Sequence, residues 1–255
     1  MIVCKSPAEL ERMRAANALV ADVLAELSGM VAPGVTTKDL DVAAETLVRD
    51  GGAEPAFKGY RGYPCTLCAS VNEQVVHGIP SNRALGEGDI ISLDMGVKLN
   101  GFYGDSAVTV PVGKVSDDAA TLLRVTRESL EKGIAQVRLG GRISDIGHAI
   151  QQHVEKHGFS VVREFVGHGI GAALHEEPQI ANYGEPGRGP RLAEGMTLAI
   201  EPMVNVGRPA VKVLADGWTA VTKDGSLSAH FEHTVAVTKT GPLVLTRRSV
   251  PAPAA

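Results

Sequence analysis

Two aspartates lie near one another in a segment, 89–110, that the sequence predicts to be a β-hairpin. Apolar-rich runs flank Asn100-Gly101, the strongest short-range signal for a two-residue hairpin turn. Such a turn sets Asp94 opposite Ala107 and puts Asp105 two residues along on the same face, about 7–8 Å away at the backbone. The pair could lie on an exposed face. The apolar neighbours indicate burial instead, and two buried carboxylates at this distance need a cation.

Three side chains later in the chain could complete a metal site. His168 stands between glycines after a β-rich run, where the backbone must approach a neighbour closely. An isolated histidine there is usually structural, but beside several carboxylates an imidazole ligand is the better account. Glu201 and Glu232 lie in a second predicted hairpin. With the two aspartates they make an oxygen-rich set that suits two divalent cations about 3.5–4 Å apart, an arrangement that activates water.

The composition is that of an ordinary globular protein. Of 255 residues, 44% are hydrophobic and 21% are charged, which suits one large domain or two small ones. The net charge of −4 and the pI near 6.1 indicate no surface for nucleic acid or an anionic membrane. No apolar N-terminal run resembles a signal peptide or membrane span, and three cysteines, an odd count, favour a reducing cytoplasm. Cys65-x-x-Cys68 lacks the second cysteine pair of a zinc knuckle.

Helix and strand signals order the first half of the chain. Ser6-Pro7-Ala8-Glu9 combines an N-cap, a first-turn proline and a capping box, and predicts a helix that Gly29 ends. A second helix is expected at about 37–49, followed by a loop at 54–64. A strand at 66–76 then precedes the first hairpin.

The second half of the chain repeats this pattern. Gly34 matches Gly140 and Asp39 matches Asp145 at a constant offset of 106 residues, and other positions follow the same offset. Chance could account for the glycine and alanine matches alone. The equivalence of acidic residues with acidic residues favours a duplicated unit, with halves at about 6–110 and 111–240.

A longer hairpin is expected in the second half, with arms at 196–206 and 218–237 around Asp224-Gly225. Glu201 then stands where Asp94 stood in the first hairpin, and Glu232 corresponds to Asp105. Residues 251–255 are expected to form a disordered tail.

Taken together, the motifs resemble those of methionine aminopeptidase over nearly the whole chain, from about Lys5 to Leu245. Each motif alone is weak evidence, but their order and spacing are highly specific. The motifs are His77-Gly78-Ile79-Pro80, Asp94 with Asp105, Gly167-His168-Gly169-Ile170-Gly171, Leu174-His175-Glu176-Glu177-Pro178, Ile200-Glu201-Pro202-Met203 and Phe231-Glu232-His233-Thr234. The resemblance implies a single catalytic domain over 1–255 with an α+β, pita-bread fold. In that fold two pseudo-symmetric α/β halves surround a curved antiparallel sheet, with helices on the outside.

The resemblance also implies a role for each candidate residue. Asp94 would chelate one metal ion, His168 and Glu201 would bind the other, and Asp105 and Glu232 would bridge both. Glu201 would also accept the proton of the attacking water. His77 and His175 would contact the scissile amide. The methionine pocket would comprise Phe57, Tyr60, Tyr63, Cys68, His77, Leu174, His175 and Trp218.

Two of these assignments are less direct. Tyr60, Tyr63 and Trp218 could instead be ordinary packing residues. Asn72 and Ser228, with the backbone of Gln74, resemble a monovalent-cation site.

The implied activity is metal-dependent release of the N-terminal methionine from nascent proteins and peptides whose second residue is small. Two divalent ions (Co, Mn, Fe, Ni or Zn) would activate the water. The implied setting is the cytoplasm near the ribosome exit, as a monomer without nucleic-acid or membrane partners. Only 32 residues separate His168 from Glu201, which leaves no room for the insertion of type two relatives. The helix start at Ser6 leaves no zinc-binding extension, so the short bacterial type one form is expected.

Two other classes of protein share the implied fold. Aminopeptidase P, prolidase and creatinase would resemble this chain only in their catalytic half, after an N-terminal domain. Pita-bread binding proteins that have lost catalysis lack some metal ligands, whereas all five are present here.

Overall fold

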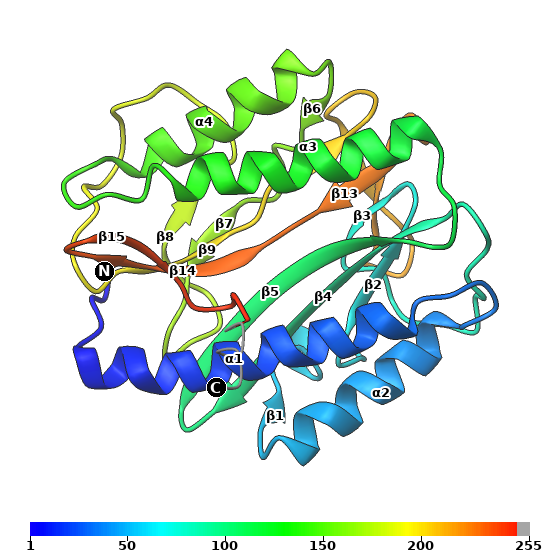
Figure 1. Cartoon of the computed structure of the whole chain (residues 1–255), viewed down its shortest axis with the longest axis horizontal. Coiled ribbons are helices and arrows are strands. Elements are labelled where there is room, and N and C mark those ends of the chain that lie inside the picture. The colour runs from blue at the N-terminus through cyan, green and yellow to red at the C-terminus, as the bar shows by residue number, and fades with distance from the viewer. Residues whose placement is uncertain (249–255) are drawn as a thin grey trace, which may run out of the picture.

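The computed structural model describes residues 1–248, and the expected tail at 251–255 lies outside them. A helix pair opens each half of the chain (Figure 1). The helices are α1 Pro7–Met30, α2 Thr37–Asp50, α3 Asp117–Ile134 and α4 Ile143–Lys156, with a short 3₁₀ helix η1 at Tyr60–Gly62. The strands are β1 Glu54–Pro55, β2 Cys68–Val71, β3 Gln74–Val76, β4 Ile90–Leu99, β5 Phe102–Pro111, β6 Ser160–Val161, β7 Gly167–Gly169, β8 Glu176–Ile180, β9 Thr197–Ile200, β10 Met203–Asn205, β11 Val211–Val213, β12 Ala220–Thr222, β13 Ser228–His230, β14 His233–Thr238 and β15 Gly241–Val244.

The first helices begin where the capping signals predict. The Ser6 hydroxyl accepts the Glu9 N–H at 3.4 Å, and the Glu9 carboxylate accepts the Ser6 N–H at 2.8 Å. Thr36 and Asp39 form the same reciprocal pair at the start of α2. Both helices end one residue past the expected positions, within the usual variation of helix ends. The helices α2 and α4 each have 14 residues.

The first hairpin has the predicted register. The strands β4 and β5 pair antiparallel over their 10 residues, with Asp94 opposite Ala107. Asn100 and Gly101 have left-handed φ values of 52° and 82°, as this two-residue turn requires. Asp94 and Asp105 are therefore diagonal neighbours on one face.

The expected single strand at 66–76 is wrong, because a turn at Asn72 separates β2 from β3. Asn72 has a left-handed φ of 56°. Its Oδ1 accepts the Ile90 N–H at 3.0 Å, and its Nδ2 donates to Asp89 at 2.8 Å. Contacts with a later segment thus stabilise a turn that the apolar pattern does not show. The expected loop at 54–64 contains β1, which pairs with β4.

The second hairpin is longer than expected and turns at a different place. The pairs β9–β14, β10–β13 and β11–β12 continue one register up to a tip at 214–217. The predicted turn at Asp224-Gly225 is wrong. Asp216-Gly217 and Asp224-Gly225 look alike in sequence, but the Asp224 carboxylate accepts the Arg208 N–H at 2.7 Å and only bends one arm of the hairpin. Trp218 directly follows the true tip.

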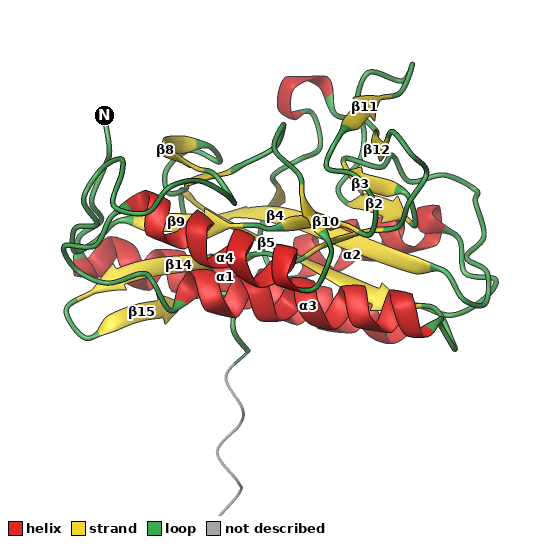
Figure 2. Ribbon diagram, turned by 90° about the horizontal axis from the view of Figure 1, so that it is seen from above, coloured by secondary structure: helices red, strands yellow, loops and turns green. Residues whose placement is uncertain are grey.

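The helices form an outer layer over antiparallel strands. Helices α1 and α3 both lie on one side of the strands (Figure 2), and Figure 1 shows them apart from each other, with β5 and β14 visible between them. One buried cluster packs α1 and α2 against β2, β4 and β5, with Leu24, Leu40 and Leu93 among its members. A second packs α3 and α4 against β9, β13 and β14. This arrangement confirms the expected α+β fold in two halves. Within residues 1–248, none of the helices is long and apolar enough to cross a membrane.

Candidate metal centre and active site

The two halves meet where β5 runs beside the second hairpin. The Glu232 N–H donates to Ala107 O at 2.9 Å, which forms an antiparallel bridge between the halves. Side-chain hydroxyls add to this seam: Ser106 Oγ donates to Glu232 O at 2.6 Å, and Thr234 Oγ1 donates to Asp105 O at 2.8 Å. The seam therefore places Asp105 and Glu232 next to each other, although they are far apart in the chain.

Four carboxylates lie beside this seam, two of them buried and two, Asp94 and Glu201, half-buried. Asp105 and Glu232 are 4% and 2% exposed. Burial raises the pKa of Asp94 to about 7 and the pKa of Glu201 to about 8. Burial, followed by repulsion from neighbouring carboxylates, raises the pKa values of Asp105 and Glu232. The protein alone does not compensate these negative charges.

His168 adds a nitrogen donor to the carboxylates. A Cβ on either flanking glycine, Gly167 or Gly169, would overlap the backbone of a neighbouring segment. His168 Nδ1 lies 2.9 Å from Gly169 O, which favours a proton on Nδ1 and leaves Nε2 free. Nε2 lies 3.6 Å from Glu201 Oε1 and 3.9 Å from Asp105 Oδ2. Burial lowers the pKa of His168 to about 4, so the ring is neutral at pH 7.

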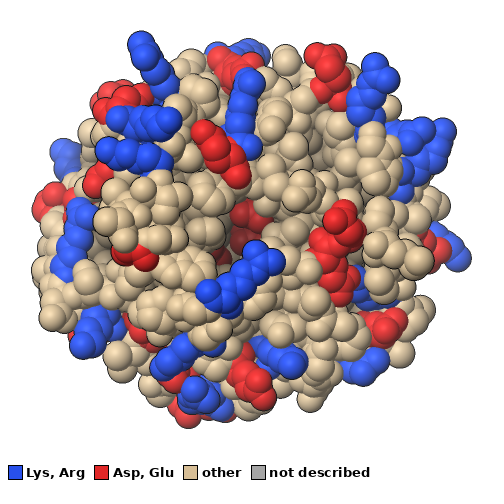
Figure 3. Space-filling view, turned by 180° about the vertical axis from the view of Figure 1, so that it is seen from behind, with Lys and Arg blue, Asp and Glu red and all other residues tan. Residues whose placement is uncertain are grey.

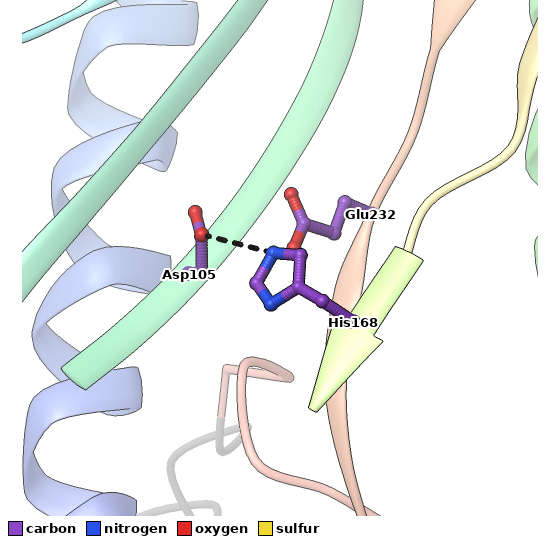
Figure 4. Close-up of side chains that lie close together, drawn as sticks. All are labelled: Asp105, His168 and Glu232. Atoms are coloured by element: carbon purple, nitrogen blue, oxygen red, sulfur yellow. Dashed lines mark ion pairs between the residues drawn. The ribbon is translucent and has the colours of Figure 1, made fainter. Parts of the chain in front are cut away.

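These donors fit a divalent metal ion. Donor atoms of Asp105, His168 and Glu232 lie within 4.8 Å of one another (Figure 4). Oxygen atoms Oδ1 of Asp94, Oδ1 of Asp105 and Oε1 of Glu232 are buried without a hydrogen-bond partner, and a bound cation would satisfy them. An oxygen-rich set with one imidazole suits borderline divalent ions. Glu201 borders this group through His168, and Asp94 lines the same pocket.

Two further histidines lie at the pocket. His175 Nδ1 is 2.9 Å from the Tyr60 hydroxyl, and the two rings stack with centroids 5.3 Å apart. His77 has a left-handed φ of 59°, and its ring packs edge-on against Phe165 and Trp218. Burial lowers the pKa of His77 to about 4 and also lowers the pKa of His175. Both imidazoles are therefore neutral near pH 7.

The remaining wall of the pocket is mainly aromatic and apolar. The Tyr63 hydroxyl donates to Leu67 O at 3.0 Å or to Gly78 O at 3.1 Å, and the Trp218 ring meets the Tyr63 ring edge-on at 5.1 Å. Trp218 reaches the pocket because β12, next to the hairpin tip, pairs with β3 of the first half. The pocket is lined by Phe57, Tyr60, Arg61, Tyr63, Cys68, His77, Asp94, Asp105, His168, Leu174, His175, Glu201, Trp218 and Glu232.

The structure therefore brings every predicted metal-binding and methionine-pocket residue to one pocket. Viewed from behind, the surface is hollowed near its centre, and acidic side chains are visible in the hollow (Figure 3). A larger cavity of about 540 Å³ lies between α1 and α3, and Glu232 is the only predicted site residue that lines it.

The residues of the predicted monovalent-cation site also lie close together. The Ser228 N–H donates to Asn72 O at 2.9 Å, and Gln74 Oε1 accepts the Val71 N–H at 2.9 Å. The Ser228 hydroxyl oxygen is buried without a partner. The cation itself stays a prediction.

Known proteins resemble this chain over nearly its full length. Residues 11–239 match the profile of metallopeptidase family M24. The chain belongs to this family. Methionine aminopeptidase 1 of Bacillus subtilis is 58% identical over 97% of this chain and 100% of its own length, and methionine aminopeptidase of Clostridium acetobutylicum is 52% identical over 96% and 99%. The chain thus groups with the methionine aminopeptidases, as the motifs predicted.

Solved structures give the same grouping. The crystal structure of methionine aminopeptidase from Thermotoga maritima is 49% identical, with a TM-score of 0.96 over 97% of this chain and 100% of that one. The prolidase of Pyrococcus furiosus has a TM-score of 0.78 at 20% identity over 97% of this chain and 66% of that one, and shows a shared fold alone. The predicted family, pita-bread fold and enzyme class, a methionyl aminopeptidase, are confirmed.

Three residues near the pocket were not predicted from the sequence. His230 is 1% exposed, neither ring nitrogen has a hydrogen-bond partner, and Nε2 lies 3.6 Å from Glu201 Oε2. Arg61 lines the pocket mouth, with its guanidinium carbon 5.4 Å from the centre of the Tyr60 ring. Lys5 forms a buried ion pair beside His175. No periodicity or spacing signal distinguishes these residues, because their partners are distant in sequence.

Proposed function

We propose that this chain hydrolyses the first peptide bond of polypeptides that begin with methionine followed by a small residue. The observation that carries this proposal is one pocket in which a carboxylate–imidazole cluster adjoins an aromatic and apolar wall. A polarizable thioether packs well against such aromatic rings. The relatives named methionine aminopeptidase support the same substrate class.

We assign the pair of divalent ions to Asp94, Asp105, His168, Glu201 and Glu232. Asp94 would hold one ion, His168 and Glu201 the other, and Asp105 and Glu232 both. When bound, the ions supply the Lewis acidity that lets water react near neutral pH. The donor set is compatible with Co, Mn, Fe, Ni or Zn. Metal analysis of protein isolated from its native host without added metal would identify the ion.

Glu201 and the two pocket histidines carry the proton transfers and polar contacts in this proposal. Glu201 accepts a proton from the attacking water and passes it to the leaving amine. If the Tyr60 hydroxyl donates to His175 Nδ1, the ring carries its proton on Nε2 and can donate to the substrate carbonyl oxygen. That contact strengthens as negative charge develops on the oxygen. His77 contacts the scissile amide from its place beside Trp218.

Substrate binding follows from the remaining pocket residues. Phe57, Tyr60, Tyr63, Cys68, Leu174 and Trp218 would surround the methionine side chain, together with His77 and His175. Asn72 and Ser228, with the backbone of Gln74, would hold a monovalent cation at the turn between β2 and β3. We further infer that the substrates are new polypeptides near the ribosome exit, and that the enzyme acts in the cytoplasm as a monomer. The three cysteines are free thiols, which agrees with a reducing compartment.

Two comparisons test this function. A chelator should abolish hydrolysis of Met-Ala-Ser, and a divalent metal should restore it, whereas a binding module would show no hydrolysis. Met-Ala-Ser should be cleaved far faster than Ala-Pro-Ala. The opposite preference would assign the chain to the proline-specific peptidases that share its fold.

A further inference from the structure

Lys5 is a buried lysine outside the proposed metal site. The residue is 7% exposed and directly precedes Ser6, which caps α1. Its Nζ pairs with the Glu176 carboxylate and donates to Val3 O at 3.0 Å. Its backbone N–H donates to Gly195 O at 2.7 Å. The chain before α1 therefore attaches to the second half of the molecule. Figure 1 agrees with this, because the chain before α1 runs toward the side where β8 and β15 lie.

Glu176 links Lys5 to the loop that carries His175. Its Oε1 accepts the Ala173 N–H at 3.1 Å, while Oε2 faces Lys5. The Gly171 N–H donates to Ala173 O at 3.0 Å, and Gly171 O accepts the Tyr103 N–H at 2.8 Å. One carboxylate thus closes the loop at 171–176 and binds the lysine at the same time.

Glycines leave just enough room for this lysine. A Cβ on Gly171 would overlap Lys5 Cε and Nζ, and a Cβ on Gly195 would overlap the Lys5 backbone oxygen. The side chains of Lys5 and Glu176 are 3% and 13% exposed. The ammonium group therefore lies in a closely packed position, and Glu176 is the carboxylate that it pairs with there.

We propose that Lys5 is a positioning residue: through Glu176 it holds the loop at 171–176, and thereby Leu174 and His175, against the pocket. Burying an ion pair is a weak source of stability, because desolvation offsets most of the attraction. Its effect is to select one loop conformation. The expected loss of catalysis rests on the proposed function of His175. The conformation of the loop does not depend on that function.

The first test is Lys5→Met, which keeps an unbranched side chain of nearly the same length and removes its charge. An unpaired Glu176 should leave its buried position and release the Ala173 amide. Hydrogen exchange at Ala173 should accelerate at least tenfold, a readout that needs no substrate. The kcat for Met-Ala-Ser should fall by about 10–100-fold, because small misplacements of a catalytic group have effects of this size. Metal content should not change, since no ligand is in the loop.

Two controls separate positioning from loss of stability. Arg49→Met removes an exposed ion pair with Glu45 and should leave kcat within twofold of the parent. Val48→Ala removes buried volume in α2, away from the pocket, and should lower the unfolding midpoint without lowering kcat. If Lys5→Met lowers kcat no more than Val48→Ala does, the positioning role is overturned.

The second test is a double-mutant cycle with Glu176→Gln. If Lys5→Met does not fold, Glu176→Gln alone serves, and a kcat equal to that of the parent would overturn the proposal. Each single variant leaves one buried charge unpaired, and the double variant leaves none. The product of the two single-variant losses in kcat should exceed the loss of the double variant by about tenfold. The proposal would be overturned if the loss of kcat in the double variant equalled the product of the two single-variant losses. Unchanged hydrogen exchange at Ala173 would overturn it as well. A different outcome is that the parent protein does not hydrolyse Met-Ala-Ser, while the variants still show accelerated hydrogen exchange at Ala173. That outcome would refute the proposed function and support the loop contact.

Discussion

Thr109 places a side-chain hydroxyl at the seam between the two halves. Its Oγ1 donates to His230 O at 2.7 Å, accepts the His230 N–H at 2.9 Å and lies 2.8 Å from Ser92 Oγ. The residue is 3% exposed, in β5. Valine has nearly the same shape, but it can make none of these contacts. Thr109→Val therefore isolates the contribution of the hydroxyl.

The expected loss follows from the groups left without a partner. The N–H and C=O of His230 would both stay buried, and each unsatisfied group costs about 1–3 kcal/mol. Ser92 would lose a further contact. We expect the free energy of unfolding to fall by about 3–5 kcal/mol, a large part of the 5–15 kcal/mol typical of a whole domain.

The assay is urea unfolding of the metal-free protein, followed by metal titration. Thr46→Val is the control, because the Thr46 hydroxyl is exposed and bonds only within α2, to Val42 O at 2.9 Å. That variant should change the free energy of unfolding by less than about 0.5 kcal/mol. Because β13 leads directly to Glu232, Thr109→Val should also weaken metal binding. A loss in Thr109→Val no larger than in the control would refute the idea that side-chain hydroxyls hold the halves together.

Three further predictions use the site and the N-terminus. His175→Ala should keep the metal content of the parent while kcat/KM falls by orders of magnitude; loss of metal would show that its role is misassigned. Because burial raises the pKa of Asp94 to about 7 and that of Glu201 to about 8, the metal-free fold holds protons that the unfolded chain has released. The free energy of unfolding of the metal-free protein should therefore fall as pH rises from about 6.5 to 8. The fall should be up to about 1.4 kcal/mol per pH unit for each proton held. Urea unfolding with a chelator at several pH values checks the sign of this change. Met1 should be retained in the cell, since the second residue, Ile2, is not small; intact mass spectrometry showing a chain that begins at Ile2 would contradict the expected specificity.

Features set by neighbouring residues could be predicted from the sequence. The Asn100-Gly101 turn alone determines the register of β4 and β5, because a two-residue loop allows one pairing. The capping boxes at Ser6 and Thr36 likewise act within one turn of helix. The motif order identified the family, which the similarity to M24 proteins confirms. The roles of the individual site residues stay proposals.

The misplaced elements are those that distant contacts decide. Asp216-Gly217 and Asp224-Gly225 are equivalent as local signals, and the tip forms at the first pair because β11 and β12 continue the register of β9 and β14. Asn72 interrupts an apolar run because Asp89 and Ile90 hold its side chain. Local periodicity in the sequence predicts neither the strand register nor the contacts of the Asn72 side chain.

The sequence by itself determined which side chains could bind metal and that Asp94 and Asp105 share one strand face, since both follow from residue type and alternation along a strand. Only the tertiary structure decided that Asp105, His168 and Glu232 lie within 4.8 Å of one another, and that Lys5 lies against Glu176. The physical reason is that these distances depend on how two hairpins and the chain before α1 pack. Such packing is the sum of many contacts between residues far apart in the chain, and no short segment encodes it.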